Sequence, residues 1–363
     1  MKYVDEFRDP ALARKLLARI SSCSTRPMRL MEFCGGHTHA ILRHGLRTLL
    51  PPTVELRSGP GCPVCVTANP DLDRAIALTQ VPGLILTTFG DMVRVPGSSQ
   101  SLQHAKAAGA DVRMVYSTLD ALRVARENPA RPVVFLGVGF ETTAPTIAAA
   151  ILQAAAERLG NFSVLSLHKL TPPATRAILD AGEIALDGII GPGHVTAIIG
   201  ADAWQFLPTE YGMPVAVAGF EPLDILRAVA DLVDMVQDSQ PAVSNSYARS
   251  VTRQGNRAAM ETMDRVFEVS AANWRGLGVV PASGLRLRPE FVQFDAAHLF
   301  EVDPGPTREH KGCRCGDVLR GTITPPACPL FGQACTPARP IGPCMVSAEG
   351  ACAAYYQFGR DLP

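Results

Sequence analysis

The stretch Arg29-Leu-Met-Glu-Phe-Cys-Gly-Gly-His37 joins a short apolar run to a double-glycine turn. An apolar run bounded by such a turn predicts a buried strand, and the glycines permit a sharp change of direction after it. Similar runs alternate with amphipathic stretches along the chain, which is typical of parallel sheets covered by helices on both faces. The predicted strands are 29–33, 54–57, 84–88, 112–115, 133–136, 162–167, 188–190 and 215–218.

The chain length predicts more than one domain. Its 363 residues correspond to two or three domains of ordinary size. Gly59-Pro-Gly-Cys-Pro63 resembles Gly191-Pro-Gly-His-Val195, which suggests two related lobes, although a chance match of glycine-rich turns is an open alternative. We expect an α/β fold with two related, doubly wound parallel-sheet lobes and a small Cys-rich iron–sulfur domain. The expected parts are a helical segment over 1–28 that packs on the C-terminal module, lobes over 29–128 and 129–280, and the Cys-rich domain over 281–363.

The charge balance of the chain is neutral. Lys plus Arg and Asp plus Glu both number 34, which argues against binding nucleic acid or anionic membranes through bulk positive charge. The first residues are polar, and no apolar run reaches the roughly 18 residues of a membrane span. We therefore expect a cytoplasmic protein. In a reducing compartment, clustered cysteines favour metal binding or redox chemistry over structural disulfides.

The ten cysteines are unevenly placed, and six of them lie near the C-terminus. Soft thiolates suit an iron–sulfur cluster or zinc. A zinc site usually shows close Cys pairs or a His partner, whereas Cys313 and Cys315 are the only close pair here. Four cluster ligands plus a redox-active pair account for all six, while zinc binding and simple packing are the alternatives. The six are Cys313, Cys315, Cys328, Cys335, Cys344 and Cys352.

Two further cysteine motifs follow predicted strands. Cys62-Pro-Val-Cys65 has the spacing of a redox dithiol, in which the thiolate pKa is lowered. Cys34 and His37 follow the carboxyl end of a strand, where ligands bind in open α/β sheets. A thiolate and an imidazole at this place supply a soft metal ligand and a proton carrier. The alternatives are small buried residues in turns and a helix-capping histidine.

A third glycine-rich turn, Gly137-Val-Gly-Phe-Glu-Thr-Thr143, lacks the third glycine of a dinucleotide fingerprint. The chain also lacks the P-loop pattern, which argues against a nucleotide hydrolase of that class. The two glycines of the first turn, the polar residues after this strand and two later His motifs are weaker candidates for lining a cleft. These cleft candidates are Gly35, Gly36, Glu141, Thr142, Thr143, His168, Lys169 and His194.

Taken together, these motifs resemble the HypD family of nickel–iron hydrogenase maturation factors. The resemblance runs from about residue 28 to the end of the chain. It rests on Cys34-Gly-Gly-His37, Gly59-Pro-Gly-Cys-Pro-Val-Cys65, Thr88-Phe-Gly-Asp-Met-Val-Arg-Val-Pro-Gly97, Gly139-Phe-Glu-Thr-Thr-Ala-Pro145 and the Cys313 to Cys352 block.

The resemblance implies a cytoplasmic scaffold with redox activity rather than a conventional turnover enzyme. Such a factor assembles an iron centre that carries two cyanides and one carbon monoxide. It pairs with HypC, accepts cyanide from HypE, and passes the centre to the hydrogenase large subunit through HypC. An iron–sulfur disulfide reductase acting on a protein partner is the alternative function, and a zinc-stabilised binding module is a third.

The resemblance also implies residue roles. Cys34 would hold the iron together with a cysteine of HypC, with His37 beside it. Cys62 and Cys65 would form a thiol/disulfide pair at the same cleft. The last module resembles that of ferredoxin–thioredoxin reductase, which implies a redox disulfide between Cys315 and Cys344. The implied ligands of a 4Fe–4S cluster are Cys313, Cys328, Cys335 and Cys352, whereas Cys23 matches no family motif.

Overall fold

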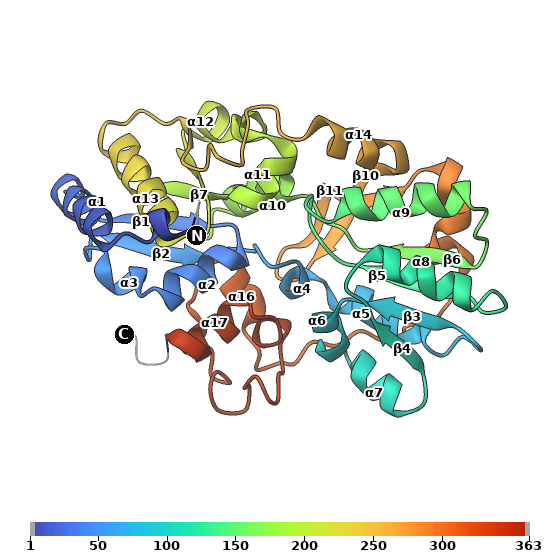
Figure 1. Cartoon of the computed structure of the whole chain (residues 1–363). Helices are drawn as coiled ribbons and strands as arrows, with labels where there is room; N and C mark the ends of the chain where they lie inside the picture. Colours follow the sequence, from blue (N-terminus) through green and yellow to red (C-terminus); the bar gives the residue numbers. More distant parts are fainter. Residues whose placement is uncertain (1–3, 360–363) are drawn as a thin grey trace.

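Two parallel β-sheets form the centres of two lobes in the computed structural model, which describes residues 4–359 (Figure 1). The first sheet has the order β2-β1-β7-β8-β9, with β1 (Met28–Glu32), β2 (Val54–Ser58), β7 (Gly188–Pro192), β8 (Val215–Ala218) and β9 (Val243–Asn245). The second has the order β4-β3-β5-β6, with β3 (Ile85–Thr88), β4 (Asp111–Met114), β5 (Val133–Gly137) and β6 (Phe162–Ser166). All neighbouring strands in both sheets are parallel. The α/β fold is confirmed, and every strand predicted from the sequence is present.

Helices cover both faces of each sheet because successive strand residues point to opposite sides. In β1, Met31 contributes to one hydrophobic core and Leu30 to another. In β5, Phe135 and Val134 are divided in the same way between two cores of the second lobe. The helices around the first sheet are α1 (Pro10–Cys23), α2 (Gly35–Arg43), α3 (Leu46–Leu49), α10 (Thr171–Ala181), α11 (Gly193–Ile199), α12 (Phe206–Tyr211) and α13 (Pro222–Gln237). Those around the second are α5 (Asn69–Leu78), α6 (Gly90–Arg94), α7 (Leu102–Ala107), α8 (Thr118–Glu127), α9 (Ala144–Ala156), α14 (Arg257–Val266) and α15 (Ala296–Leu299).

The topology divides the chain differently from the expected lobes 29–128 and 129–280. Strands β1 and β2 share a sheet with β7, β8 and β9, whereas β3 to β6 form the other sheet. The Gly59 and Gly191 turns, compared above as one landmark per lobe, both lie by the first sheet. Local apolar periodicity identifies strands, but pairing between strands far apart in sequence decides which sheet each one joins.

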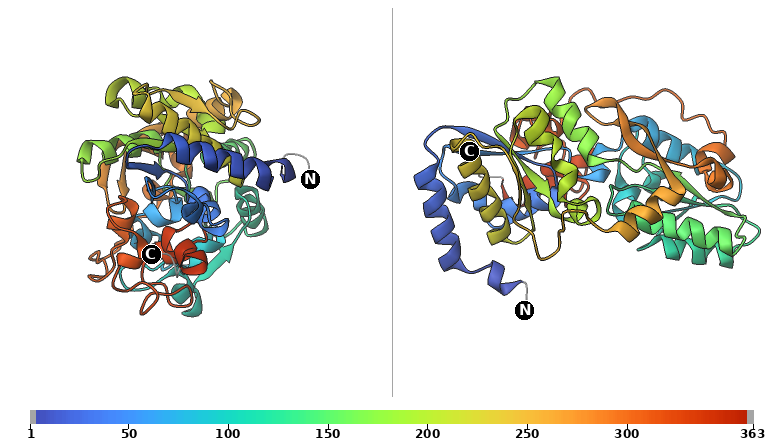
Figure 2. Two further views of the ribbon diagram at one scale, coloured as in Figure 1. Left: turned by 90° about the vertical axis from the view of Figure 1, so that its left-hand side faces the viewer. Right: turned by 90° about the horizontal axis from the view of Figure 1, so that it is seen from above.

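The N-terminal helix α1 packs on α13 of the first lobe, whereas we expected it to pack on the C-terminal module. Figure 2 shows α1 (dark blue) alongside α13 (yellow). Asp9 caps α1 by accepting hydrogen bonds from the first-turn amides, and Pro10 begins the helix. Its Ile20 is fully buried in the core that α13 shares, so the contact is a hydrophobic one.

The Cys-rich C-terminal region is a separate module of short elements. It contains α16 (Cys315–Leu319), α17 (Ala351–Phe358) and the short 3-10 turns η4 (Pro325–Ala327) and η5 (Pro343–Met345). Helix α17 packs on α2 through Ala354 and Tyr355 against Leu42. The remaining short elements are α4 (Pro63–Val66), η1 (Asp5–Phe7), η2 (Ala201–Trp204) and η3 (Pro289–Phe294).

The start of the C-terminal module also differs from the expected residue 281. The antiparallel hairpin β10 (Phe267–Trp274) and β11 (Gly278–Leu287) contributes Leu285 and Leu287 to the core of the second lobe. Ala296 of α15 lies in the same lobe. The change to a Pro- and Gly-rich composition therefore occurs within the second lobe, before the C-terminal module begins.

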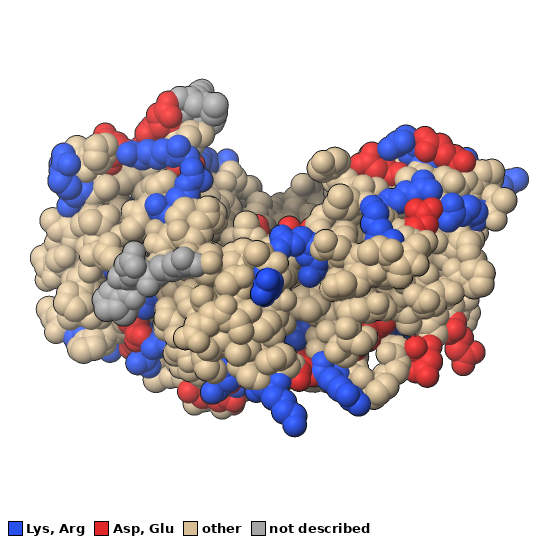
Figure 3. Space-filling view, turned by 90° about the horizontal axis from the view of Figure 1, so that it is seen from below, with Lys and Arg blue, Asp and Glu red and all other residues tan. Residues whose placement is uncertain are grey.

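The surface seen in Figure 3 mixes basic and acidic side chains, in agreement with the formal net charge of zero. A notch on this face lies between the two lobes. Within residues 4–359, no helix has the length and apolar character needed to cross a membrane.

Candidate functional site

Cys34 lies at the carboxyl edge of the first sheet, where β1 ends and α2 begins. Its thiol is 1% exposed, and its Sγ lies 3.5 Å from Nδ1 of His194. His194 follows β7 in the same way, so two adjacent parallel strands bring the two side chains together. Burial raises the pKa of the Cys34 thiol and lowers the pKa of His194 to about 4. The pair is therefore a neutral thiol beside a neutral imidazole.

His37, expected beside the thiol, has a different partner. Its Nε2 lies 3.2 Å from the carbonyl oxygen of Ala218 and 3.0 Å from that of Gly219, and its ring stacks on Phe220. Burial lowers the pKa of His37 to about 4, with a smaller contribution from His194. A neutral His37 thus donates to the end of β8, and His194 is the histidine in contact with Cys34. The sequence signal for His194 was the Gly-Pro-Gly turn that precedes it, because the same three residues precede Cys62.

Close backbone contacts fix the position of Cys34. The amide of Gly35 donates to the carbonyl oxygen of Gly61 at 3.0 Å, and a Cβ on Gly61 would overlap the Cys34 backbone. A Cβ on Gly35 would overlap the carbonyl oxygen of Glu349 in the C-terminal module. Gly36 faces the ring of Phe220 at a hypothetical Cβ distance of 3.0 Å. Glycine at these positions lets three separate segments meet at Cys34.

A buried carboxyl group, missed by sequence reasoning, also holds this turn. Glu32 is 2% exposed, accepts the amide hydrogen of Cys34 at 2.9 Å, and accepts the hydroxyl hydrogen of Thr38. Burial raises the pKa of Glu32 to about 8. The signal for this residue was a lone acidic side chain in the apolar run before Cys34.

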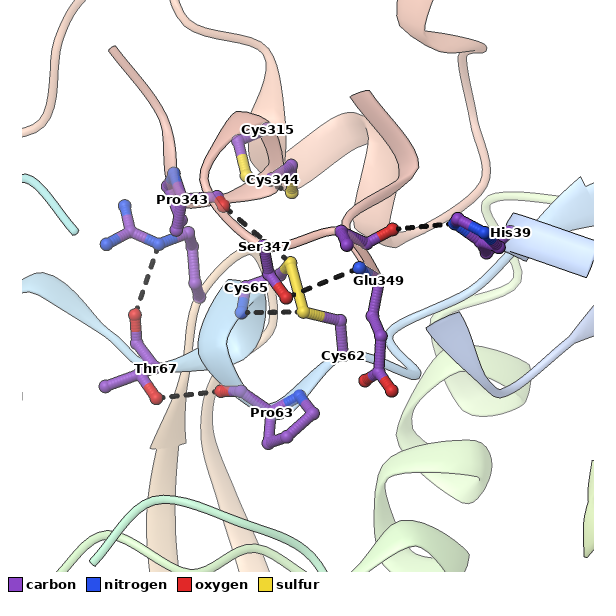
Figure 4. The surroundings of a disulfide bond; sticks show 12 residues. His39, Cys62, Pro63, Cys65, Thr67, Cys315, Pro343, Cys344, Ser347 and Glu349 are labelled. Carbon is purple, nitrogen blue, oxygen red and sulfur yellow. Dashed lines mark hydrogen bonds between the residues drawn. A yellow bond between two sulfur atoms is a disulfide. The ribbon is translucent and has the colours of Figure 1, made fainter. Parts of the chain in front are cut away.

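Cys62 and Cys65 form a disulfide at the start of α4 (Figure 4). Sγ of Cys62 accepts the amide hydrogen of Cys65 at 3.2 Å. Sγ of Cys65 lies 3.9 Å from the carbonyl oxygen of Pro343, the residue before Cys344. Both half-cystines are buried. Because Gly61 contacts Cys34 and Cys65 lies near Pro343, the disulfide lies between the Cys34 turn and the C-terminal module.

One cavity in the C-terminal module is lined by all six of its cysteines together with Leu330, Phe331 and Met345. Within it, the Sγ atoms of Cys315 and Cys344 lie 2.7 Å apart, which distinguishes this pair from the other thiols. A Cβ on Gly342 would lie 2.8 Å from Sγ of Cys313, so glycine keeps space free beside the thiols. The remaining four are Cys313, Cys328, Cys335 and Cys352.

The donor set of this cavity fits an iron–sulfur cluster. Its lining contains six cysteines and no His, Asp or Glu, and such clusters are held by four cysteine thiolates. In the described part of the chain, no three His, Cys, Asp or Glu side chains are grouped closely enough to hold a single metal ion. A cluster distributes one thiolate to each of its irons, and its ligands therefore stand farther apart.

The Cys62–Cys65 disulfide and cysteines of the C-terminal module share one core. A single hydrophobic core contains Cys62, Cys65, Cys315 and Cys344, and Cys313 and Cys352 pack against it. Figure 4 shows Cys344 and Cys315 on the module side of the Cys62–Cys65 disulfide. The fold therefore brings together cysteines from the two ends of the sequence.

An open pocket reaches the Cys34 turn from solvent. Gly36 and His194, which both lie next to the Cys34 thiol, line it together with Phe220 and Glu349. Basic side chains dominate the rest of its wall. The full lining, called the entrance pocket below, is Arg8, Gly36, His39, Ala40, Arg43, His44, His194, Phe220, Glu221, Ala348 and Glu349.

Glu141, Thr142 and Thr143 belong to the second lobe. Glu141 accepts the amide hydrogen of Thr171 at 2.7 Å and its hydroxyl hydrogen at 3.1 Å, and so caps α10. Thr143 donates to the carbonyl oxygen of Phe140. Among the described residues, no hydrogen bond or ion pair joins these three side chains to Cys34. Cys23 lies on α1, in a different core from the other thiols.

The HypD family profile, described as the hydrogenase formation hypA family, matches residues 11–359. The chain belongs to the HypD family. It is 51% identical to the hydrogenase maturation factor HypD of Azotobacter vinelandii over 99% of this chain and 98% of that protein. It is 49% identical to HypD of Rhizobium leguminosarum bv. viciae over 99% and 96% of the two chains. It is 45% identical to HypD of Escherichia coli K12 over 99% of both chains. The family resemblance predicted from the motifs is confirmed.

Proposed function

We propose that this chain, a hydrogenase maturation factor by its family, is the scaffold on which the iron centre of nickel–iron hydrogenases is assembled. The iron, with two cyanides and one carbon monoxide, is its cargo and is held by Cys34. The observation that carries the proposal is that the Cys62 loop contacts the Cys34 backbone through Gly61, while the C-terminal module contacts the adjacent Gly35 through Glu349. This arrangement brings the anchoring thiolate of Cys34 close to the cysteines that would supply electrons.

Binding of iron converts the Cys34 thiol to a thiolate. His194, at 3.5 Å, accepts the released proton, because its imidazole is neutral in the resting pair. A thiolate is a soft ligand that suits low-valent iron bearing cyanide and carbon monoxide. HypC reaches the iron through the entrance pocket and supplies the second cysteine ligand, and HypE delivers cyanide by the same opening. HypC then carries the centre to the hydrogenase large subunit in the cytoplasm.

The C-terminal module supplies reducing equivalents to this site. Cys313, Cys328, Cys335 and Cys352 would hold a 4Fe–4S cluster, which when bound would pass two electrons, one at a time, from an external electron donor to the Cys315/Cys344 pair. The reduced pair then exchanges with the Cys62–Cys65 disulfide, beside which Pro343 and Cys344 lie. The Cys62–Cys65 bond breaks, a Cys315–Cys344 bond forms, and two electrons and two protons pass to Cys62 and Cys65.

The alternative, a disulfide reductase for a protein partner, is less well supported. Such an enzyme must present its disulfide to the attacking thiol of another protein. Cys62 is 3% exposed and Cys65 is not exposed at all. The disulfide is instead placed for exchange within the chain.

Counting iron and sulfide tests the proposal. Anaerobic protein co-purified with HypC should contain about five irons and about four sulfides per chain. Cys34→Ala should lose about one iron and keep all sulfide, whereas Cys328→Ala should lose the sulfide. Cys23→Ala is the matched control and should resemble the wild type. Equal iron in Cys34→Ala and the control would exclude Cys34 as the anchor.

A further inference from the structure

A second pocket lies in the second lobe, apart from the thiol site. It is formed where the segment after β6 meets the β10–β11 hairpin and α15. Its polar wall includes Asp71, Arg74, His168, Lys169 and Arg286. No cysteine lines this pocket, so it belongs to neither the iron anchor nor the thiol relay.

Lys169 contributes a largely buried side chain to the wall of this pocket. Its side chain is 2% exposed, and within residues 4–359 its Nζ donates no hydrogen bond. The nearest carboxylate oxygen, on Asp71, is 3.8 Å away, and on another side the ammonium lies 5.8 Å from the centre of the Trp274 ring. Nζ is not among the fully buried polar atoms of the described residues, so it faces the pocket, and its hydrogen bonds are made to molecules that enter there.

His168 is a second buried group without a full set of partners. Its Nδ1 lies 2.9 Å from the Ser166 hydroxyl, whose hydrogen is donated to the carbonyl oxygen of Leu285. His168 therefore donates from Nδ1, which leaves Nε2 as a buried acceptor with no partner. As an acceptor, Nε2 of His168 offers no hydrogen bond to an anion, so a group that binds one must be a cation of this wall.

The charges of the wall favour an anion. Arg74, Lys169 and Arg286 carry positive charge, against the single carboxylate of Asp71. Arg74 donates to the carbonyl oxygen of Ala297, and Arg286 pairs with Glu268. Nζ of Lys169, by contrast, donates no hydrogen bond within residues 4–359.

We propose that this pocket binds a small molecule through a carboxylate or phosphate group that accepts hydrogen bonds from the Lys169 ammonium. The anion completes the coordination of a buried cation and competes with Asp71 for it. Trp274 lies close enough to Lys169 to report binding. The proposal does not depend on the iron site, so its failure would leave the proposed function intact.

Trp274 fluorescence provides the test. The chain has two tryptophans, and Trp204→Phe leaves Trp274 as the only emitter. In this background, titration with inorganic phosphate and, separately, with acetate should give a saturable change for at least one anion. The anion that saturates at lower concentration identifies the ligand class. Calorimetric titration of the chain with both tryptophans intact repeats the measurement without the background substitution.

Three variants decide whether Lys169 is the binding group. Lys169→Gln should weaken binding by about tenfold or more, because it removes a charge-assisted hydrogen bond. Asp71→Asn should tighten it severalfold by removing the competing carboxylate. Lys106→Gln, an exposed lysine on α7, is the matched control and should bind like the parent. Absence of saturable binding of both anions, or equal binding by a folded Lys169→Gln variant, would overturn the proposal. If Lys169→Gln does not fold, unchanged or weaker binding by Asp71→Asn overturns it instead.

Discussion

The thiol of Cys34 and Nδ1 of His194 lie 3.5 Å apart, although 160 positions separate the two residues in the sequence. The contact arises because β1 and β7 are neighbours in one parallel sheet and each is followed by a turn at the same edge. A neutral imidazole at this distance can take the thiol proton when iron binds.

The first prediction concerns this histidine. His194→Ala should lower iron bound at the Cys34 site by about tenfold, because a buried thiol without a proton acceptor resists ionisation. Sulfide content should not change. Iron analysis of anaerobic protein, with the exposed His310→Ala as control, measures the effect. Full iron content in a folded His194→Ala protein would show that another group takes the proton.

The second prediction concerns the contact between the Cys62 loop and Cys34. Gly61→Ala places a methyl group against the Cys34 backbone and should destabilise the fold by about 2 kcal/mol. Gly160→Ala is the control, since no atom lies within 4 Å of its hypothetical Cβ. Urea unfolding of both variants measures the difference. Similar midpoints for the two would mean that the Cys62 loop does not press on Cys34.

The third prediction is a pH dependence of stability. Burial raises the pKa of Glu141 to about 7 from its ordinary 4.5, so the folded state binds a proton that the unfolded state releases in that range. Its contribution to stability is present below pH 4.5 and declines as the pH rises toward 7. Glu141→Gln should gain stability relative to wild type over this window, on the order of 3 kcal/mol at its upper end.

The measurement for Glu141 is urea unfolding at several pH values between 4 and 8. Glu290→Gln, which changes an exposed carboxyl group, is the control and should run parallel to the wild type. A constant difference between Glu141→Gln and wild type across the range would show that Glu141 is ionised in the folded protein.

The fourth prediction concerns the relay from the module to the disulfide. Cys315→Ser should keep the brown colour of the cluster but leave Cys62–Cys65 oxidised after chemical reduction of the cluster. Alkylation followed by mass spectrometry should then find two fewer free thiols in the motif than in wild type. Cys23→Ser controls for the loss of one thiol. Equal reduction of the disulfide in Cys315→Ser would exclude this route.

The sequence predicted the strands well because each is a short apolar run with β-branched residues, such as 133–136 and 215–218. It did not predict that β7 and β8 would share a sheet with β1 and β2, because pairing between distant strands leaves no local pattern. For the same reason it did not show that the ring of His194 contacts the Cys34 thiol. His37 could be identified because it is close to Cys34 in sequence, whereas the contact with His194 depends on the pairing of two distant strands.

The glycine and cysteine motifs carried more information than the periodicity. Gly35 and Gly61 were noted as turn residues, and in the structure they let the module and the Cys62 loop reach Cys34. Glu32 was overlooked, because a single carboxyl group in an apolar strand has no motif of its own. The division of the last six cysteines came from family resemblance and stays a prediction.

Infrared spectroscopy of the chain co-purified with HypC tests most directly whether Cys34 holds the cyanide- and carbonyl-bearing iron. The wild-type complex and the Cys23→Ala control should show cyanide and carbonyl stretching bands of equal intensity. In Cys34→Ala these bands should be absent while the cluster colour is retained. Bands of wild-type intensity in Cys34→Ala would contradict the account, because the iron would then be anchored elsewhere.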